Sequence, residues 1–283
     1  KPSDVTTQLW CNVTIKRYKE TSVGVYSLID SVNHTAVSGY NNYIGGYNQT
    51  PSNSEMLVMA NPNIELLYLE GTTYDINVYA NLTSGNNISF VYNDLSGGNI
   101  SIDNFSATGK TVLKIPITKA ISGYSKGNYL AIKYYVGGVL TETKTFLVKP
   151  ICEPKYTTVV CNFINRYGGW QRLNFFKAQT NSITTKGTKY NVSQSSINYN
   201  TSVGKTKVIN KNGNQLITLN TGFVDENYGD LIQDLLLSQT ILLDGKPALV
   251  KSDTLELKSS INNKNINYEV QFEYSSDLIN NVI

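Results

Sequence analysis

The sequence predicts a mainly β protein with two strand-rich regions and a single helix. Three observations lead to this prediction. Apolar and polar residues alternate over much of the chain, turn-forming residues recur between these runs, and only one stretch has helical periodicity. A chain of 283 residues can bury a sizeable core, and its length favours two domains.

The first region covers residues 1–149. Two alternating runs, Thr7–Tyr18 and Ser22–Ile29, predict half-buried strands. Gly39–Ser54 is rich in Gly, Asn and Tyr and predicts a long exposed loop. His34, the only histidine, lies between predicted strands, and we interpret it as a surface turn residue.

Strand signals are densest over residues 65–149, where short β-forming runs alternate with Gly- and Asn-containing turns. This rhythm is typical of an immunoglobulin-like or fibronectin-like β-sandwich. Gly137-Gly138 suits a two-residue hairpin turn. The predicted strands are Glu65–Glu70, Thr73–Leu82, Ile88–Tyr92, Ile100–Phe105, Thr111–Ile117, Tyr129–Val136 and Val139–Val148.

A linker is predicted at residues 150–155, because Pro150 and Pro154 cannot both lie inside a central strand. The second region, residues 156–283, is predicted to be a β-rich α+β domain. A K-N-G-N turn at 211–214 is expected to close a hairpin between two of its strands. The predicted strands are Tyr156–Asn165, Trp170–Lys177, Ser182–Val192, Lys205–Ile209, Gln215–Asn220, Asp253–Ser259 and Ile266–Tyr274.

The single helix is predicted over residues 225–238. Asp225 suits the N-cap, and Glu226 and Asp230 place negative charge near the positive end of the helix dipole. Apolar residues at three- and four-residue spacing form one broad face, which we expect to pack on the sheet of this domain. These residues are Phe223, Tyr228, Leu231, Ile232, Leu235 and Leu236.

A hairpin is predicted directly after the helix. Thr240–Leu243 is a short β-branched and apolar run, and the strand returns through Ala248–Val250. Asp244-Gly245 between them can adopt the positive φ angles of a type I′ turn.

Charge and hydropathy argue against two classes of partner. The formal net charge is +3, only 16% of residues are charged and no basic block is present, so we expect no nucleic-acid partner. No apolar run approaches the roughly 20 residues that span a bilayer, so no membrane partner is expected. Cys11, Cys152 and Cys161 favour free thiols, although a Cys152–Cys161 disulfide remains an alternative.

Catalytic equipment is not recognisable in the sequence. One histidine excludes a multi-histidine zinc site and disfavours a histidine-based triad, and no phosphate-binding or nucleophile motif occurs. The acids Asp225, Glu226 and Asp230 could pair as in a glycosidase, but helix-start charges explain them better. We therefore predict no enzymatic activity, no metal and no cofactor.

Several segments of the second region, in order, resemble a family of virion structural proteins of tailed bacteriophages that infect flavobacteria and related hosts. The resemblance covers residues 156–283. It implies a non-enzymatic tail or baseplate component that assembles with copies of itself and with other tail proteins in the host cytoplasm. The segments are C-N-F-I-N-R-Y-G-G-W-Q-R-L-N-F-F-K at 161–177, K-Y-N-V at 189–192, L-I-T-L-N-T-G-F-V-D-E-N at 216–227, L-L-L-S-Q-T-I-L-L at 235–243 and K-N-I-N-Y-E-V-Q-F-E-Y-S at 264–275.

Candidate assembly contacts follow from residue type, because Trp, Tyr and Arg dominate interface energetics. In the second region these are Tyr167, Trp170 and Arg172, on and beside a Gly-Gly turn expected to be flexible. A core position for Trp170 is the alternative.

In the first region Tyr40, Tyr43 and Tyr47 are spaced through the Gly/Asn-rich loop. They suggest an alternative function, that of a secreted or surface β-sandwich protein binding glycan or protein through this loop. A loop folded back on its own sandwich is an equal alternative.

Overall fold

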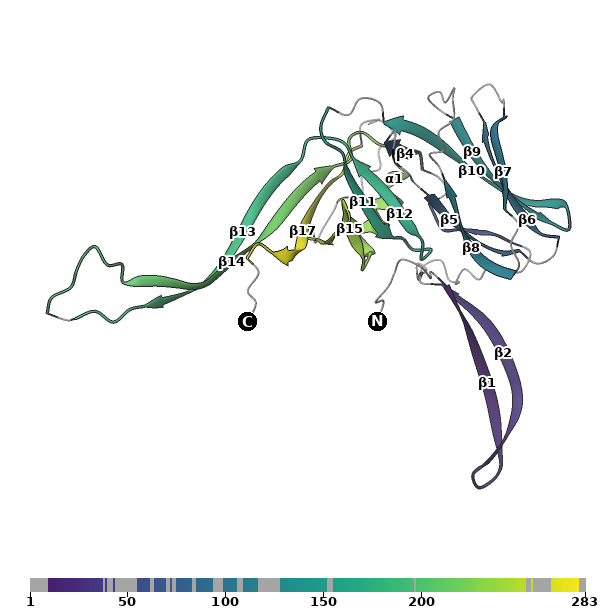
Figure 1. The fold of residues 1–283 in the computed structure, drawn as a ribbon, viewed down its shortest axis with the longest axis horizontal. Coiled ribbons are helices and arrows are strands. Elements are labelled where there is room, and N and C mark those ends of the chain that lie inside the picture. Colours follow the sequence, from purple (N-terminus) through teal and green to yellow (C-terminus); the bar gives the residue numbers. More distant parts are fainter. Residues whose placement is uncertain are drawn as a thin grey trace. The chain divides into compact units, whose positions relative to one another are not determined.

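The chain forms a mainly β structure, shown as a computed structural model in Figure 1, which confirms the predicted class. It divides into two compact units. The first comprises Lys1–Glu153, Asn162–Asn174 and Asn227–Ser238, and the second Pro154–Cys161, Phe175–Glu226 and Gln239–Ile283. The structure describes residues 10–37, 39, 43, 55–61, 64–69, 72, 75–82, 85–93, 99–105, 109–116, 128–151, 155–195, 197–252, 256 and 266–279.

The first unit begins with a two-stranded antiparallel ribbon, β1 (Trp10–Ser22) and β2 (Val25–Val37). The two-residue turn between them is Val23-Gly24, where Gly24 has φ +79°. Both strands are longer than predicted, and the predicted break between Tyr18 and Ser22 is wrong. His34 lies within β2 opposite Val13, so its assignment to a turn is wrong, although its side chain is exposed.

Two further sheets form the body of this unit. One has the order β3-β5-β8 and the other the order β4-β10-β9-β6-β7. The hydroxyl of Tyr134 in β9 donates to the carbonyl of Asn81 in β5 at 2.8 Å, which ties the two sheets together. The strands are β3 (Leu57–Val58), β4 (Leu66–Leu69), β5 (Asp75–Leu82), β6 (Asn87–Asn93), β7 (Asn99–Phe105), β8 (Gly109–Pro116), β9 (Asn128–Val136) and β10 (Val139–Ile151).

The core of this body is apolar and closely covered. Val78, Ile115, Phe90, Ile132 and Phe146 are at most 1% exposed and come from both sheets. Full burial of side chains of this size stabilises by about 1.5–3 kcal/mol each. Two sheets joined by a buried core agree with the predicted layering, whereas the immunoglobulin-like topology stays a prediction.

Strand β10 continues past the predicted end of the first region. Pro150 pairs with Tyr68 in the parallel ladder between β10 and β4. Proline is tolerated here because it lies at the end of the strand, where one missing N–H removes little of the ladder.

Helix α1 (Tyr228–Leu237) is shorter than predicted. Its N-cap is Asn227 rather than Asp225, and Asn227 makes no side-chain capping bond. The predicted apolar face is correct for Tyr228, Leu231, Ile232 and Leu235, which are buried, whereas Phe223 lies outside the helix and is 66% exposed. The Tyr228 hydroxyl donates to the Glu65 carbonyl at 2.8 Å, so the helix contacts the first region.

A buried ion pair anchors the helix. Asp234 is 0% exposed, and its Oδ1 accepts from Arg166 Nε at 2.6 Å while its Oδ2 accepts from the Asn61 amide at 3.3 Å. Burial raises the pKa of Asp234, and the hydrogen bond and charge of Arg166 oppose that shift. Removing one partner of such a pair is strongly destabilising, because it leaves the other charge buried without compensation. The pairing with Arg166 therefore explains why an aspartate lies on the inner face of α1.

A seven-stranded sheet has the order β12-β11-β15-β16-β17-β14-β13. In the second unit its core includes Phe175 and Phe272, whose rings meet edge to face with centroids 5.9 Å apart. The strands are β11 (Val159–Ile164), β12 (Trp170–Phe175), β13 (Thr180–Asn191), β14 (Thr206–Asn220), β15 (Ile241–Leu243), β16 (Lys246–Val250) and β17 (Glu269–Asp277).

Two predicted turns in this sheet have opposite outcomes. Asp244-Gly245 closes the β15–β16 hairpin with φ +47° and +78°, as predicted. The K-N-G-N turn at 211–214 is wrong, because β14 runs straight through it. Asn212, Gly213 and Asn214 pair with β13, and Asn214 also pairs with β17, so the ladders override the local turn preference.

Candidate functional site

The β1–β2 ribbon, called here the amphipathic ribbon, has an apolar and a polar face. In the half before the bulge at Arg17, directly paired positions share a face. Val13 lies opposite His34, and Ile15 lies opposite Val32. Cys11 and Ala36 extend this face, which ends at the paired Arg17 and Asp30, whereas Asn12, Thr14, Lys16, Ser31 and Asn33 lie on the other.

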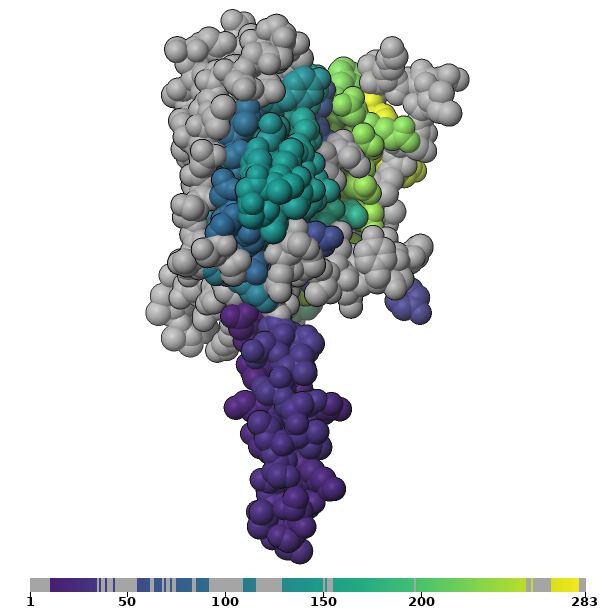
Figure 2. Space-filling view, turned by 90° about the vertical axis from the view of Figure 1, so that its right-hand side faces the viewer, coloured from purple at the N-terminus to yellow at the C-terminus, as the bar shows by residue number. Residues whose placement is uncertain are grey.

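The apolar face is not covered by any described residue. Val13 is 40% exposed, Val32 46% and Ile15 52%. Figure 2 shows the ribbon's side chains (purple) exposed along its length. Beyond the bulge, where a ribbon twists more strongly, the apolar residues change face and continue through Tyr18 and Leu28.

Cross-strand polar contacts hold the amphipathic ribbon together. Arg17 Nε donates to Asp30 Oδ1 at 2.8 Å within an ion pair, and Thr14 Oγ1 donates to Asn33 Oδ1 at 2.8 Å. The hydrogen bond from Arg17 lowers the pKa of Asp30. Both contacts are exposed, so they orient the ribbon more than they stabilise it.

A second exposed ribbon is formed by β13, the part of β14 paired with it, and the loop 192–205 between them. It is called here the basic ribbon. Every residue of β13 and the first six residues of β14 are exposed. Figure 1 shows it leaving the sheet of its unit. Its charged residues are all lysines, namely Lys186, Lys189, Lys205, Lys207 and Lys211.

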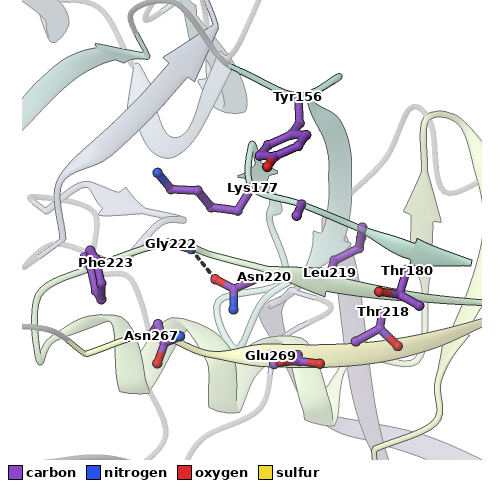
Figure 3. A pocket seen from close by; sticks show the side chains of 11 residues that line it. Tyr156, Lys177, Thr180, Thr218, Leu219, Asn220, Gly222, Phe223, Asn267 and Glu269 are labelled. Atoms are coloured by element: carbon purple, nitrogen blue, oxygen red, sulfur yellow. Dashed lines mark hydrogen bonds between the residues drawn. The ribbon is translucent and has the colours of Figure 1, made fainter.

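A pocket of about 460 Å³ lies at the root of the basic ribbon (Figure 3). Thr180 and Thr218, which form the first cross-strand pair of the ribbon, belong to its lining. Tyr156 and Phe223 add aromatic surface, and the remaining side chains are mainly polar or charged: Lys177, Asn220, Asn267 and Glu269.

The backbone after β14 holds Phe223 outward. Asn220 Oδ1 accepts from Gly222 N at 2.7 Å, and Val224 N donates to the Ile266 carbonyl at 2.8 Å. Gly222 has φ +73°, and a Cβ there would lie 2.7 Å from Lys177 Cε, so glycine suits both the turn and the close contact. An aromatic side chain that is 66% exposed between two fixed, buried neighbours indicates a contact surface.

The predicted contacts in the second region lie in and around a tight turn. Asn165 Oδ1 accepts from the Tyr167 and Gly169 amides at 3.0 and 3.1 Å, so hydrogen bonds hold this turn. Tyr167 and Trp170 are partly buried against a core cluster of Met59 and Tyr79.

Arg172 lies in β12, and its Nε donates to Asn162 Oδ1 in β11 at 3.2 Å. A role for Tyr167, Trp170 and Arg172 in assembly stays a prediction.

The predicted contacts of the Tyr-rich loop are mostly outside the described residues. Tyr43 is 98% exposed, while Tyr40 and Tyr47 lie in undescribed parts of the chain. The alternative function that depends on this loop therefore stays a prediction.

The described residues contain no group of three or more His, Cys, Asp or Glu that could hold a metal ion. None of the described helices has the length and apolarity to cross a membrane. Cys161 is a buried free thiol whose pKa is raised by burial, and Cys11 is a free, exposed thiol; Cys152 lies outside the described part.

Comparison of the chain with protein-family models, curated proteins and solved structures finds no match in any of the three. Sequence reasoning did not single out the two ribbons or the pocket. The available signal for the basic ribbon was that every charged residue between 180 and 216 is a lysine. The amphipathic ribbon had only its alternation as a signal, and buried strands share that pattern.

Proposed function

We propose that this protein is a non-enzymatic structural component that assembles into a ring or multi-copy complex through its exposed ribbons. In line with the sequence resemblance, the complex would be a bacteriophage tail or baseplate, formed in the host cytoplasm and retained in the virion. Its partners would be copies of itself and other tail proteins.

The uncovered apolar face of the amphipathic ribbon supports this proposal most directly. A two-stranded hairpin alone is marginally stable in water, and large apolar side chains on it gain nothing from exposure. Burying them against a partner is favourable by about 25 cal/mol per Å² of apolar surface. Val13, Ile15 and Val32 lie side by side and exposed, so a partner that covers them would supply this stabilisation.

The basic ribbon supports the same proposal through its geometry. A ribbon with exposed strands presents unpaired edges and side chains on both faces, which proteins use for strand addition and for insertion into neighbouring subunits. Two such ribbons, one in each compact unit, give each copy separate contact elements. Subunits with more than one contact element can form closed or extended assemblies.

Electron microscopy of the purified full chain, combined with sedimentation over a range of concentrations, tests the proposal. We expect rings or regular multi-copy particles whose proportion rises with concentration. A monodisperse monomer at every concentration, without association with any other tail protein, would contradict it. Binding of a polysaccharide by such a monomer would favour the alternative function of the Tyr-rich loop.

A further inference from the structure

Charge is unevenly distributed along the second half of the chain. Residues 154–224 contain nine Lys or Arg and no Asp or Glu, whereas residues 225–283 contain ten Asp or Glu and four Lys. Five of the nine basic residues belong to the basic ribbon. Oppositely charged segments of this kind favour contact between them over contact of either with itself.

The tip of the basic ribbon is a loop with a hydrogen-bonded base and exposed apolar residues. Val192 N donates to the Lys205 carbonyl at 2.8 Å, and Gln194 Nε2 donates to the Val203 carbonyl at 3.0 Å. Ile197 is nevertheless 86% exposed and Tyr199 66% exposed. The loop therefore presents two anchor side chains on a hydrogen-bonded base, which lowers the entropy lost on binding.

The pocket at the ribbon's root offers complementary chemistry. Phe223 and Tyr156 provide exposed aromatic surface, and the two charged residues of the lining are Glu269 and Lys177. Asp225 and Glu226 follow Phe223 closely in the chain and are exposed. Apolar anchors flanked by lysines match this aromatic surface, because its three carboxylates outnumber the one lysine, Lys177.

The tip cannot reach the pocket of its own chain. The ribbon extends from the pair Thr180–Thr218, which lines the pocket, to the pair Asn191–Thr206, which begins the tip. At about 3.3 Å per residue, these pairs are roughly 35 Å apart along the ribbon. A paired ribbon of this length does not fold back on its root, so an occupying tip must come from another copy.

We propose that the pocket formed by Tyr156, Lys177, Asn220, Phe223, Asn267 and Glu269 receives the tip of the basic ribbon of a second copy. Ile197 and Tyr199 pack against Phe223 and Tyr156, and Lys205 and Lys207 lie near Asp225, Glu226 and Glu269. This inference rests on the proposed function and names one of its contacts. The contact joins two different surfaces, so its repetition builds a ring or an extended array.

A nucleic-acid partner is the competing interpretation of a lysine-rich ribbon, because a two-stranded β-ribbon fits the major groove of DNA. The composition favours a protein partner. Three exposed side chains on the ribbon are apolar, namely Ile183, Ile197 and Val203, and a phosphate backbone offers them no partner. The same chain also supplies the acidic counterpart.

Site-directed disulfide trapping between two differently labelled full-length copies tests the contact. Both copies carry Cys11→Ser and Cys152→Ser, and the buried Cys161 is retained. One copy carries Tyr199→Cys and the other Phe223→Cys, and the mixture is oxidised with diamide. We expect a mixed disulfide at least tenfold more abundant than with the control copy Val139→Cys, which is also an exposed apolar site (67%).

Charge reversal adds a second readout. Asp225→Lys with Glu226→Lys on the pocket copy should lower trapping about tenfold at low salt, because like charges then face each other. Lys205→Glu with Lys207→Glu on the tip copy should restore it. Trapping at the Val139→Cys level, with wild-type particles still visible by electron microscopy, would overturn this contact and leave the proposed function standing.

Two further outcomes also decide the matter. If the wild-type protein forms no particles and the Tyr199→Cys and Phe223→Cys copies trap no mixed disulfide, the proposed function and this contact are both contradicted. Salt-sensitive binding of duplex DNA by the basic ribbon, with control-level trapping, would replace the contact with a nucleic-acid partner.

Discussion

Strands β1 and β11 share a Cys-Asn-apolar segment but lie in opposite environments. β1 contains Cys11-Asn12-Val13, and β11 contains Cys161-Asn162-Phe163. In β11 the alternate positions Val159, Cys161 and Phe163 are at most 5% exposed, whereas in β1 Val13 is 40% exposed. An alternating pattern therefore predicts a two-faced strand, but it does not say whether the cover comes from the same chain or from a partner.

The largest expected effect is on the covered strand. Phe163→Ala should lower the free energy of unfolding by about 3–5 kcal/mol, because it removes a fully buried ring and leaves a cavity. Urea denaturation measures this. Val13→Ala with Ile15→Ala on the uncovered strand is the matched control and should shift stability by less than about 0.5 kcal/mol each. Equal losses in both variants would mean that the amphipathic ribbon is covered within its own chain.

The reverse experiment addresses association. Val13→Asp with Ile15→Asp should weaken assembly about 100-fold, which corresponds to about 2.8 kcal/mol, because two charges would enter an apolar interface. Sedimentation velocity at several concentrations gives the dissociation constant. Thr14→Asp lies on the polar face of the same strand and should leave assembly unchanged; if it is equally disruptive, the apolar face is not the contact.

A smaller effect is expected in the salt dependence of association, which should differ between the two ribbons. Lys189→Glu with Lys207→Glu should weaken association about tenfold at low ionic strength and little at 1 M salt, where the screening length is about 3 Å. The conservative pair Lys189→Arg with Lys207→Arg should behave as wild type at both. Association through the amphipathic ribbon should persist in high salt, so an equal salt response of both ribbons would remove the distinction between them.

The mildest test uses the two cysteines without altering either strand. In a Cys152→Ser background, Cys11 should react readily with a thiol reagent in the free protein and several-fold more slowly in assembled particles. Cys161 should react only after denaturation, because burial excludes reagent and raises the pKa of its thiol. Rapid labelling of Cys161 in the native protein would show that the sheet around β11 opens.

Local chemistry predicted much of the fold. Asp244-Gly245 and Gly137-Gly138 both adopt positive φ in hairpin turns, as their residue types require. The buried face of α1 follows from the spacing of Leu231, Ile232 and Leu235. Such features could be predicted because the interactions that decide them are close in sequence.

Other features could not be predicted because distant partners decide them. The turn-forming K-N-G-N at 211–214 stays in β14, since β13 on one side and β17 on the other supply its ladder partners. Asn210, the residue before this segment, adopts φ +50° at the register shift that interrupts the β13–β14 ladder. Phe223 fits the helical spacing but lies outside α1, because Asn220 and Ile266 fix the chain before the helix begins.

The candidate site likewise has features that the sequence predicts and features that depend on tertiary structure. The sequence by itself determined that the protein is mainly β, that one helix interrupts the strands, and that lysines without acids fill the stretch that becomes the basic ribbon. Only the tertiary structure decided which alternating strands are covered, that two ribbons leave their side chains exposed, and that a pocket lies at the root of one of them. The physical reason is that alternation and turn preference act over a few residues, whereas burial depends on which surfaces the rest of the chain leaves without a partner.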